Sequence, residues 1–265
     1  MTKSLTALVF WLLASIAPAS AGLTTLQLQR AGFTQHIGAT IPGDLLFRDS
    51  DGKSTRLAAV LAGEPAFLVF VDYKCRTLCG VVADQIAQSL SRMPLNPSRD
   101  YHLIFVGLGE DRGPADAAKF KRDHLGGTRL AKSAIALVGV KGSSVALEKV
   151  VGLSAVYDPG HDQYAHPVGV VLVDAKKRIR RYLDPFSLAS FDLRLALTDA
   201  GSTGAGFVDH ALLLCYGWDA VTGLYTPIIR RILVMGCGAI VLVILLGVGA
   251  SLVRERLLAR ARDNV

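Results

Sequence analysis

The sequence predicts an α/β domain in which buried strands alternate with helices, followed by one transmembrane helix. Continuous apolar runs rich in strand-forming residues occur at 66–72 and 102–108, and a helical pattern follows each run. Buried strands separated by helices indicate a sheet that is covered by helices on both faces.

The N-terminus has the pattern of a secretory signal peptide. Lys3 supplies a positive charge, residues 5–17 are apolar, and small residues at 19–21 form a cleavage site. An uncleaved anchor helix is the alternative, but the apolar run is short for a full membrane span. We therefore expect residues 1–21 to be removed and the rest of the chain to be exported.

A second apolar segment, 232–253, carries no charge and is long enough to cross roughly 30 Å of hydrocarbon as a helix. More arginines follow this segment than precede it, so the tail at 254–265 is expected in the cytoplasm. The sequence thus predicts a single-pass protein of the inner membrane whose soluble domain lies in the periplasm.

The net charge of +7 does not indicate a nucleic-acid-binding protein. Residues 22–229 carry 22 Lys and Arg against 20 Asp and Glu, a net of +2, and the other basic residues flank the two apolar segments. The sequence has no basic stripe with interleaved aromatic residues, which is the usual footprint on a phosphate backbone.

The exported part divides into a lead-in segment at 22–37, a domain at 38–198 and a linker at 199–231. Gly and Ser dominate residues 201–206, which we expect to be flexible. Within the domain, the patterns predict strands at 45–49, 66–72, 102–108, 134–140, 155–158, 169–174 and 179–183, and helices at 80–92, 114–124, 143–151 and 188–197.

Cys75 and Cys79 form a C-x-x-x-C pair between the first buried strand and its helix. A strand, a cysteine pair and then a helix is the thioredoxin arrangement. The positive end of the helix dipole stabilises thiolate there, and thiolates are soft ligands that suit Cu(I). On spacing alone, a plain disulfide is an equally good interpretation. Cys215 and Cys237 are expected only to pack.

A third ligand is needed to hold Cu(I) firmly or to accept Cu(II), and histidine is the natural choice. Of the six histidines, His166 stands just before the strand at 169–174, and Pro167 favours an extended backbone there. In a thioredoxin-like fold this loop lies beside the cysteine pair. A lone loop histidine is more often no ligand at all, and His161 is the next candidate.

Three stretches of the predicted domain carry a family resemblance: FLVFVDYKCRTLCG, VGLGEDRGPADAAKFKRDHLGG and YDPGHDQYAHPVGVVLVDAKKRIRRYL. Together they resemble the Sco (SenC-type) copper chaperones of cytochrome c oxidase assembly over about residues 40–198. The resemblance implies a thioredoxin-like fold and one copper ion bound by Cys75, Cys79 and His166. It also implies a periplasmic copper donor and delivery to oxidase subunit II or a similar cuproprotein.

The chain departs from the family pattern in two ways. Many relatives have proline within or just after the cysteine motif, where this chain has Arg76 and Gly80. Familiar members are anchored by an N-terminal span, whereas this chain resembles a bacterial form with a C-terminal anchor. The first departure affects loop rigidity and redox potential without removing a ligand.

Two functions remain open on the sequence. The first is a copper metallochaperone, which is not primarily an enzyme. The second is a membrane-tethered thiol–disulfide oxidoreductase in which Cys75 and Cys79 form a redox disulfide. The usual redox motif is C-x-x-C and needs no neighbouring histidine. A peroxidase or redox sensor would use the same cysteines, but no other feature favours it.

Two carboxylates and one further pair are weaker candidates. Asp72 and Asp162 could orient His166 from outside the ligand shell, although capping or solvated carboxylates are simpler interpretations. Cys215 and His210 could form an auxiliary metal site, but residues five apart do not share a helix face, so packing is the simpler interpretation.

Overall fold

The structure, a computed structural model, describes four stretches of the chain: 22–61, 63–186, 189–219 and 224–262. The predicted signal peptide lies outside them. Contacts divide the chain into unit 1, Met1–Gly204, and unit 2, Ala205–Val265. Each unit is described by itself.

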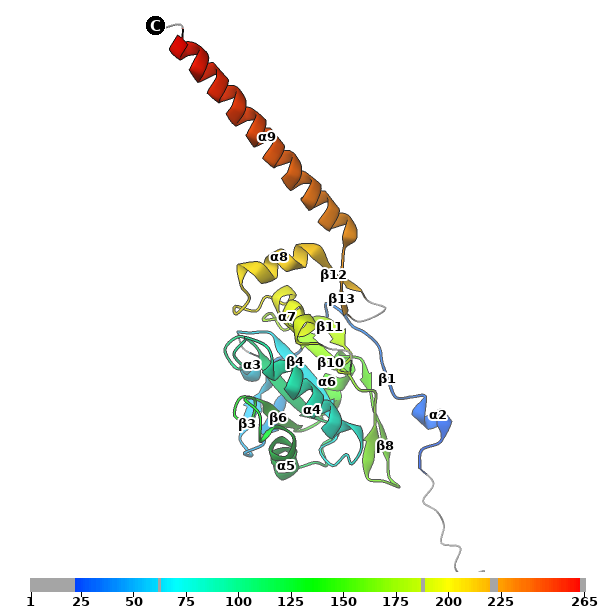
Figure 1. Cartoon of the computed structure of the whole chain (residues 1–265). Coiled ribbons are helices and arrows are strands. Elements are labelled where there is room, and N and C mark those ends of the chain that lie inside the picture. Colours follow the sequence, from blue (N-terminus) through cyan, green and yellow to red (C-terminus); the bar gives the residue numbers. More distant parts are fainter. Residues whose placement is uncertain (1–21, 62, 187–188, 220–223, 263–265) are drawn as a thin grey trace, which may run out of the picture. The chain divides into compact units, whose positions relative to one another are not determined.

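Unit 1 is built on a mixed seven-stranded sheet (Figure 1). The strand order is β11 (Ile179–Leu183), β10 (Val170–Val173), β4 (Ala66–Val71), β5 (His102–Gly107), β6 (Ile135–Gly139), β2 (Leu46–Asp49) and β3 (Ser54–Arg56). The three central strands β4, β5 and β6 are parallel, and the outer pairs are antiparallel. The predicted strands are present, and the sequence patterns missed only the short edge strand β3 of this sheet.

Helices cover both faces of the sheet, as predicted. Alternate residues such as Leu68 and Phe70 of β4 share a core with α3 (Leu57–Val60) and α6 (Ser143–Val150). Phe105 of β5 faces the other side, where it packs on α5. The helices grouped on that second face are α4 (Leu78–Ser91), α5 (Pro114–Leu125) and α7 (Ser190–Asp199). The period-2 alternation of side chains explains why the central strands are apolar throughout.

The strand register brings three loops to one edge of the sheet. Val71 ends β4 opposite Gly107, which ends the parallel strand β5, so the loops after both strands leave together. Strand β10 runs antiparallel and pairs Val170 with Val69, so the segment before β10 reaches the same edge. The cysteine loop, residues 108–113 and the loop that carries His166 therefore meet there.

Short elements complete unit 1. The lead-in segment holds α2 (Thr25–Leu28) and β1 (Gly32–Phe33), which pairs with β7 (Leu153–Ser154). A second pair joins β8 (Val156–Asp158) to β9 (Gln163–Ala165), so His166 follows a strand directly. The sequence predicted β8 but not β9.

Two residues of the stretch 201–206, which is predicted to be flexible, have specific hydrogen-bond partners in unit 1. The Ser202 hydroxyl is buried and donates to the Asp100 carbonyl over 2.6 Å. The Thr203 hydroxyl donates to Glu64 Oε1 over 2.7 Å. Composition does not reveal such specific partners, which here attach Ser202 and Thr203 to Asp100 and Glu64.

Unit 2 contains α8 (Phe207–Cys215), the hairpin β12 (Tyr216–Asp219) with β13 (Leu224–Pro227), and the long helix α9 (Ile229–Arg262). Within α9, residues Leu233–Ser251 have a mean hydropathy of 2.6 and are long and apolar enough to cross a membrane. The segment predicted as a linker thus contains a helix and a hairpin.

Candidate metal and thiol site

The two cysteines occupy the positions that the sequence predicts. Cys75 lies in the loop after β4, where its N–H donates to the Asp72 carbonyl over 2.9 Å. Cys79 is the second residue of α4. Both are free thiols, with Cys79 buried and Cys75 half-buried. The Thr77 hydroxyl lies 3.3 Å from Cys75 Sγ.

The pKa values of the two thiols are shifted in opposite directions. A hydrogen bond from the Cys79 thiol is the largest cause that lowers the pKa of Cys75 to about 4, and donors at Thr77 and the Cys79 N–H add to it against the effect of burial. The same bond, together with burial, raises the pKa of Cys79 far above its ordinary value. At neutral pH the site therefore holds one thiolate and one thiol.

This pairing predicts a distinct titration. Absorbance at 240 nm, which reports thiolate, should show one thiolate at neutral pH that is lost as the pH falls through about 4, the pKa of Cys75. A Cys75→Ser variant should lose this step, whereas Cys215→Ser should keep it. A first thiolate that appears only above about pH 8, the range of free cysteine, would contradict the prediction.

His166 presents one ring nitrogen to the cysteine pair. Its Nδ1 lies 2.9 Å from the Pro167 carbonyl, which can only accept, so Nδ1 carries the proton. Its Nε2 lies 3.6 Å from Cys79 Sγ. Burial lowers the pKa of His166 and keeps the ring neutral at neutral pH. A lone pair of imidazole therefore points at the buried sulfur.

These donors fit a soft metal ion. With bonds of roughly 2.3 Å to sulfur and 2.0 Å to nitrogen, the values known for zinc, a tetrahedral angle sets the two atoms about 3.5 Å apart. Cys79 Sγ and His166 Nε2 match that separation. Within the described residues, no three or more His, Cys, Asp and Glu side chains lie together so that they could hold a metal ion as they stand. A third bond would require the Cys75 thiolate to turn from Cys79 toward the ion.

Other histidines are held elsewhere. His161, the next candidate in the same loop, places Nδ1 2.7 Å from Asp158 Oδ2. His210 bonds the Gly206 carbonyl through Nδ1. Cys215 and His210 belong to no metal-binding cluster within the described residues. The structure thus places His166, rather than His161, against a cysteine.

A buried arginine that the sequence analysis missed joins the loops of the site. Arg112 follows β5 and is 2 % exposed, and its partner Asp72 is fully buried. Arg112 Nε donates to Asp72 Oδ1 over 3.0 Å, and Nη2 to Oδ2 over 3.3 Å. Asp72 also accepts from the Lys74 N–H and the Tyr164 N–H, both at 3.0 Å. One carboxylate thus ties the cysteine loop to the strand that ends just before His166.

Asp162 forms the second carboxylate contact of Arg112. Arg112 Nη1 donates to Asp162 Oδ1 over 2.9 Å, and Nη2 to the Asp162 carbonyl over 2.7 Å. The first of these bonds is the main cause that lowers the pKa of Asp162 to about 2. Asp162 therefore acts on the site through Arg112, and Asp72 acts both through Arg112 and through the Lys74 and Tyr164 N–H groups.

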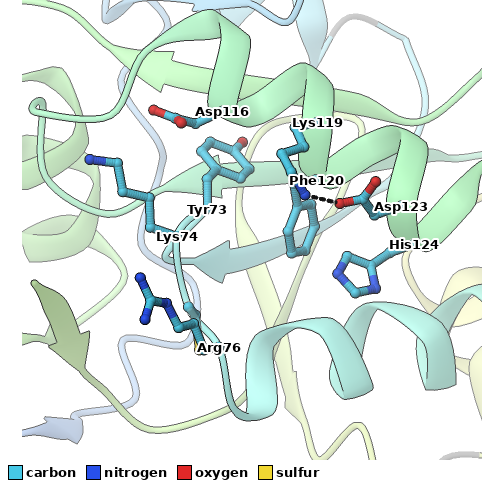
Figure 2. A pocket seen from close by; sticks show the side chains of 9 residues that line it. Tyr73, Lys74, Arg76, Asp116, Lys119, Phe120, Asp123 and His124 are labelled. Carbon is cyan, nitrogen blue, oxygen red and sulfur yellow. Dashed lines mark hydrogen bonds and ion pairs between the residues drawn. The ribbon is translucent and has the colours of Figure 1, made fainter. Parts of the chain in front are cut away.

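A cavity of about 300 Å³ opens between the cysteine loop and α5 (Figure 2). Its walls are Tyr73, Lys74, Cys75, Arg76, Asp116, Lys119, Phe120, Asp123 and His124. In Figure 2 the Lys119 and Asp123 side chains of α5 pair with each other, and His124 lies beside them. The half-buried Cys75 is therefore reachable from a partly cationic hollow.

The packing of His124 on α5 against α4 explains why residue 80 is a glycine. A Cβ at Gly80 would clash with the ring of His124. The His124 ring packs on Phe120 with centroids 4.8 Å apart, and its Nδ1 lies 3.1 Å from Asp84 Oδ1. Glycine after Cys79 thus permits α5 to approach α4 closely, where proline would not fit.

Comparisons with known proteins identify the fold of unit 1. No protein-family model matches the chain, and no curated protein matches it in sequence. Among solved structures, an Aquifex aeolicus VF5 protein described as a candidate electron transfer protein matches with TM-score 0.56 and 19 % identity, over 64 % of this chain and 96 % of that one.

Two Sco structures match similarly. BsSco, a member of the Sco family of cytochrome c oxidase assembly proteins, gives TM-score 0.51 and 17 % identity, over 64 % of this chain and 96 % of that one. Bradyrhizobium japonicum ScoI with copper bound gives 0.50 and 18 %, over 62 % and 97 %. At such identities the likeness concerns the fold, and unit 1 therefore has the thioredoxin-like fold found in Sco proteins.

Proposed function

We propose that this chain is a copper metallochaperone that binds one copper ion through Cys75, Cys79 and His166. The observation that carries the proposal is the 3.6 Å approach of His166 Nε2 to Cys79 Sγ, beside Cys75, whose pKa is lowered by the Cys79 thiol. Two thiolates and a neutral imidazole suit Cu(I), and the nitrogen also admits Cu(II). The half-buried Cys75 leaves a route for ligand exchange with a partner.

The fold of unit 1 supports the same assignment. Copper is bound in the B. japonicum ScoI structure, and BsSco belongs to a family of cytochrome c oxidase assembly proteins. By this likeness we propose that the chain assists the metallation of cytochrome c oxidase, with subunit II or a similar cuproprotein as acceptor and a periplasmic protein as copper donor.

Helix α9 would tether this domain to the membrane of its target. Its apolar part, Leu233–Ser251, is long enough to span a bilayer. Together with the N-terminal export pattern, this supports a copper domain in the periplasm and a C-terminal tail in the cytoplasm. A tether of this kind raises the effective concentration of the site near a membrane-bound acceptor.

The acidities of the cysteine pair favour a second function, reduction of a disulfide in the acceptor. The Cys75 thiolate would attack one sulfur of that disulfide, forming a mixed disulfide and releasing the other sulfur as a thiolate. Cys79 would then lose its proton, for which His166 Nε2 is the nearby acceptor, and attack Cys75. Two electrons pass to the acceptor, which leaves with both thiols, and Cys75 and Cys79 end as a disulfide.

Substitution of His166 by alanine tests its role as a copper ligand while both thiols stay in place. We expect His166→Ala to weaken Cu(II) binding by a factor on the order of 100, and Cu(I) binding much less, because two thiolates still satisfy linear Cu(I). Competition with chelators of known affinity measures both in the full chain in detergent. His161→Ala, which removes a neighbouring imidazole, should change neither. Unchanged affinity of His166→Ala for both ions would overturn the ligand assignment.

A further inference from the structure

Helix α8 in unit 2 exposes the face that a helix normally buries. Phe207 is 89 % exposed, Val208 63 % and Leu214 57 %, whereas Asp209 is buried. At 100° per residue, the three exposed side chains lie within one stripe, and Asp209 lies on the opposite side. Three large apolar side chains exposed together on one face of a helix indicate an interaction with another apolar surface.

A backbone hydrogen bond links the end of α8 to the residue that precedes the apolar helix α9. The Ile228 N–H donates to the Cys215 carbonyl over 2.7 Å, which closes the base of the β12–β13 hairpin against the last residue of α8. Helix α9 begins at the next residue, Ile229. The level of α8 along the axis of α9 is therefore set at this point by a backbone hydrogen bond.

The short distance along α9 between Ile228 and the apolar span indicates that this hydrogen bond lies near a membrane surface. The apolar span begins at Leu233, five residues after Ile228. At 1.5 Å per residue this separation is about 7.5 Å. The headgroup layer of each leaflet is about 5–8 Å thick, half the difference between the whole bilayer and its hydrocarbon core. If α9 spans a bilayer, the end of α8 lies at the level of the headgroups.

The β12–β13 hairpin carries aromatic residues, which favour the headgroup layer of a membrane. Tyr216, Trp218 and Tyr225 lie on its two strands, and Trp218 pairs with Tyr225 across them with ring centroids 5.4 Å apart. Rings with an apolar body and one polar group are enriched at membrane–water interfaces. The hairpin therefore has the chemistry of the interface, next to a helix whose apolar stripe has the chemistry of the acyl chains.

We infer that α8 and the β12–β13 hairpin form an interfacial platform that lies in the headgroup layer of the bilayer entered by α9. Phe207, Val208 and Leu214 reach the upper acyl chains, and the half-buried Tyr216 and Trp218 of the hairpin lie among the headgroups, with the buried Tyr225 packed behind Trp218. The occupant of the stripe is lipid because α8 ends at the headgroup level of α9, whose own apolar span has no buried residue in the described part of the chain. The inference depends on α9 as the anchor and is independent of copper binding.

The tryptophan content of the chain provides the test. The sequence has two tryptophans, Trp11 and Trp218, so Trp11→Phe leaves one reporter in the hairpin. The full chain is reconstituted into phosphatidylcholine vesicles that contain lipid with a nitroxide at the headgroup or bromine at defined acyl positions. We expect headgroup and shallow acyl quenchers to quench Trp218 most strongly, and aqueous iodide to quench it weakly.

A second reporter tests α8 itself. In a Trp11→Phe, Trp218→Phe background, Phe207→Trp places the only tryptophan on the exposed stripe, where shallow acyl bromine should quench it. Val145→Trp in the same background is the matched control, because Val145 is also an exposed apolar side chain but lies on α6 of unit 1. Iodide, and not bromolipid, should quench that control.

Each contrary outcome has a separate meaning. If the protein fails to float with the vesicles, α9 is no anchor and the inference falls with it. If it floats but iodide quenches Trp218 and the Phe207→Trp reporter as readily as Val145→Trp, the anchor stands and the platform is wrong. If the Phe207→Trp reporter is shielded from both quenchers and the protein is dimeric, a second copy covers α8 and lipid is the wrong occupant.

Discussion

A chain with both Cys75→Ser and Cys79→Ser is expected to lose its copper. Hydroxyl groups are poor ligands for a soft ion, and His166 alone offers a single nitrogen. After loading and desalting, we expect copper to fall from about one ion per chain to below about a tenth of that. Copper is measured by atomic absorption on the full chain in detergent.

The chain offers a matched control for this loss. A Cys215→Ser, Cys237→Ser variant also removes two thiols, but neither lies in unit 1. It should bind as much copper as the unaltered chain. If both double variants retain one copper, the metal site does not use the C-x-x-x-C pair, and the assignment fails.

Replacement of Arg112 by methionine should produce the largest loss of stability. Asp72 would remain fully buried without its ion-pair partner. Removing one member of a buried ion pair costs about 3–5 kcal/mol in the free energy of unfolding. For a unit of this size the midpoint of thermal unfolding should fall by roughly 10 °C. Near-UV circular dichroism measures it through the tyrosines, because Trp218 lies in unit 2.

Two further variants show whether the unpaired, buried Asp72 carboxylate causes the loss of stability. Adding Asp72→Asn to Arg112→Met removes the unpaired carboxylate and should recover part of the loss, a non-additivity expected for contacting residues. Lys119→Met breaks the exposed pair with Asp123 and should leave the free energy of unfolding nearly unchanged, because an exposed pair contributes little. If Arg112→Met is as mild as Lys119→Met, the buried pair does not hold the three loops together.

Much of the fold was predictable because period and apolar character are local properties. The runs at 66–72 and 102–108 are strands β4 and β5, and the cysteine pair lies between β4 and α4 as expected. The position of His166 followed from an assumed thioredoxin-like topology. The antiparallel register of Val170 with Val69 supplies the physical reason, since it brings the segment before β10 to the end of β4.

The arrangement around Arg112 could not be predicted in the same way. Residues 109–113 have the composition of an ordinary polar loop, and Arg112 is buried because it pairs with Asp72, forty residues earlier, and with Asp162, fifty residues later. One signal was available, because this loop follows a buried strand at the same sheet edge as the cysteines. Likewise, the proton on His166 Nδ1 depends on its contact with the Pro167 carbonyl, which spacing does not reveal.

X-ray absorption at the copper edge tests the central claim most directly. The full chain in detergent is loaded with one equivalent of copper under reducing conditions, and the ligands of the metal are counted by element. The account predicts two sulfur ligands and one imidazole nitrogen, with the nitrogen lost in His166→Ala and both sulfurs lost in the Cys75→Ser, Cys79→Ser variant. A shell made only of nitrogen and oxygen in the unaltered chain would contradict it.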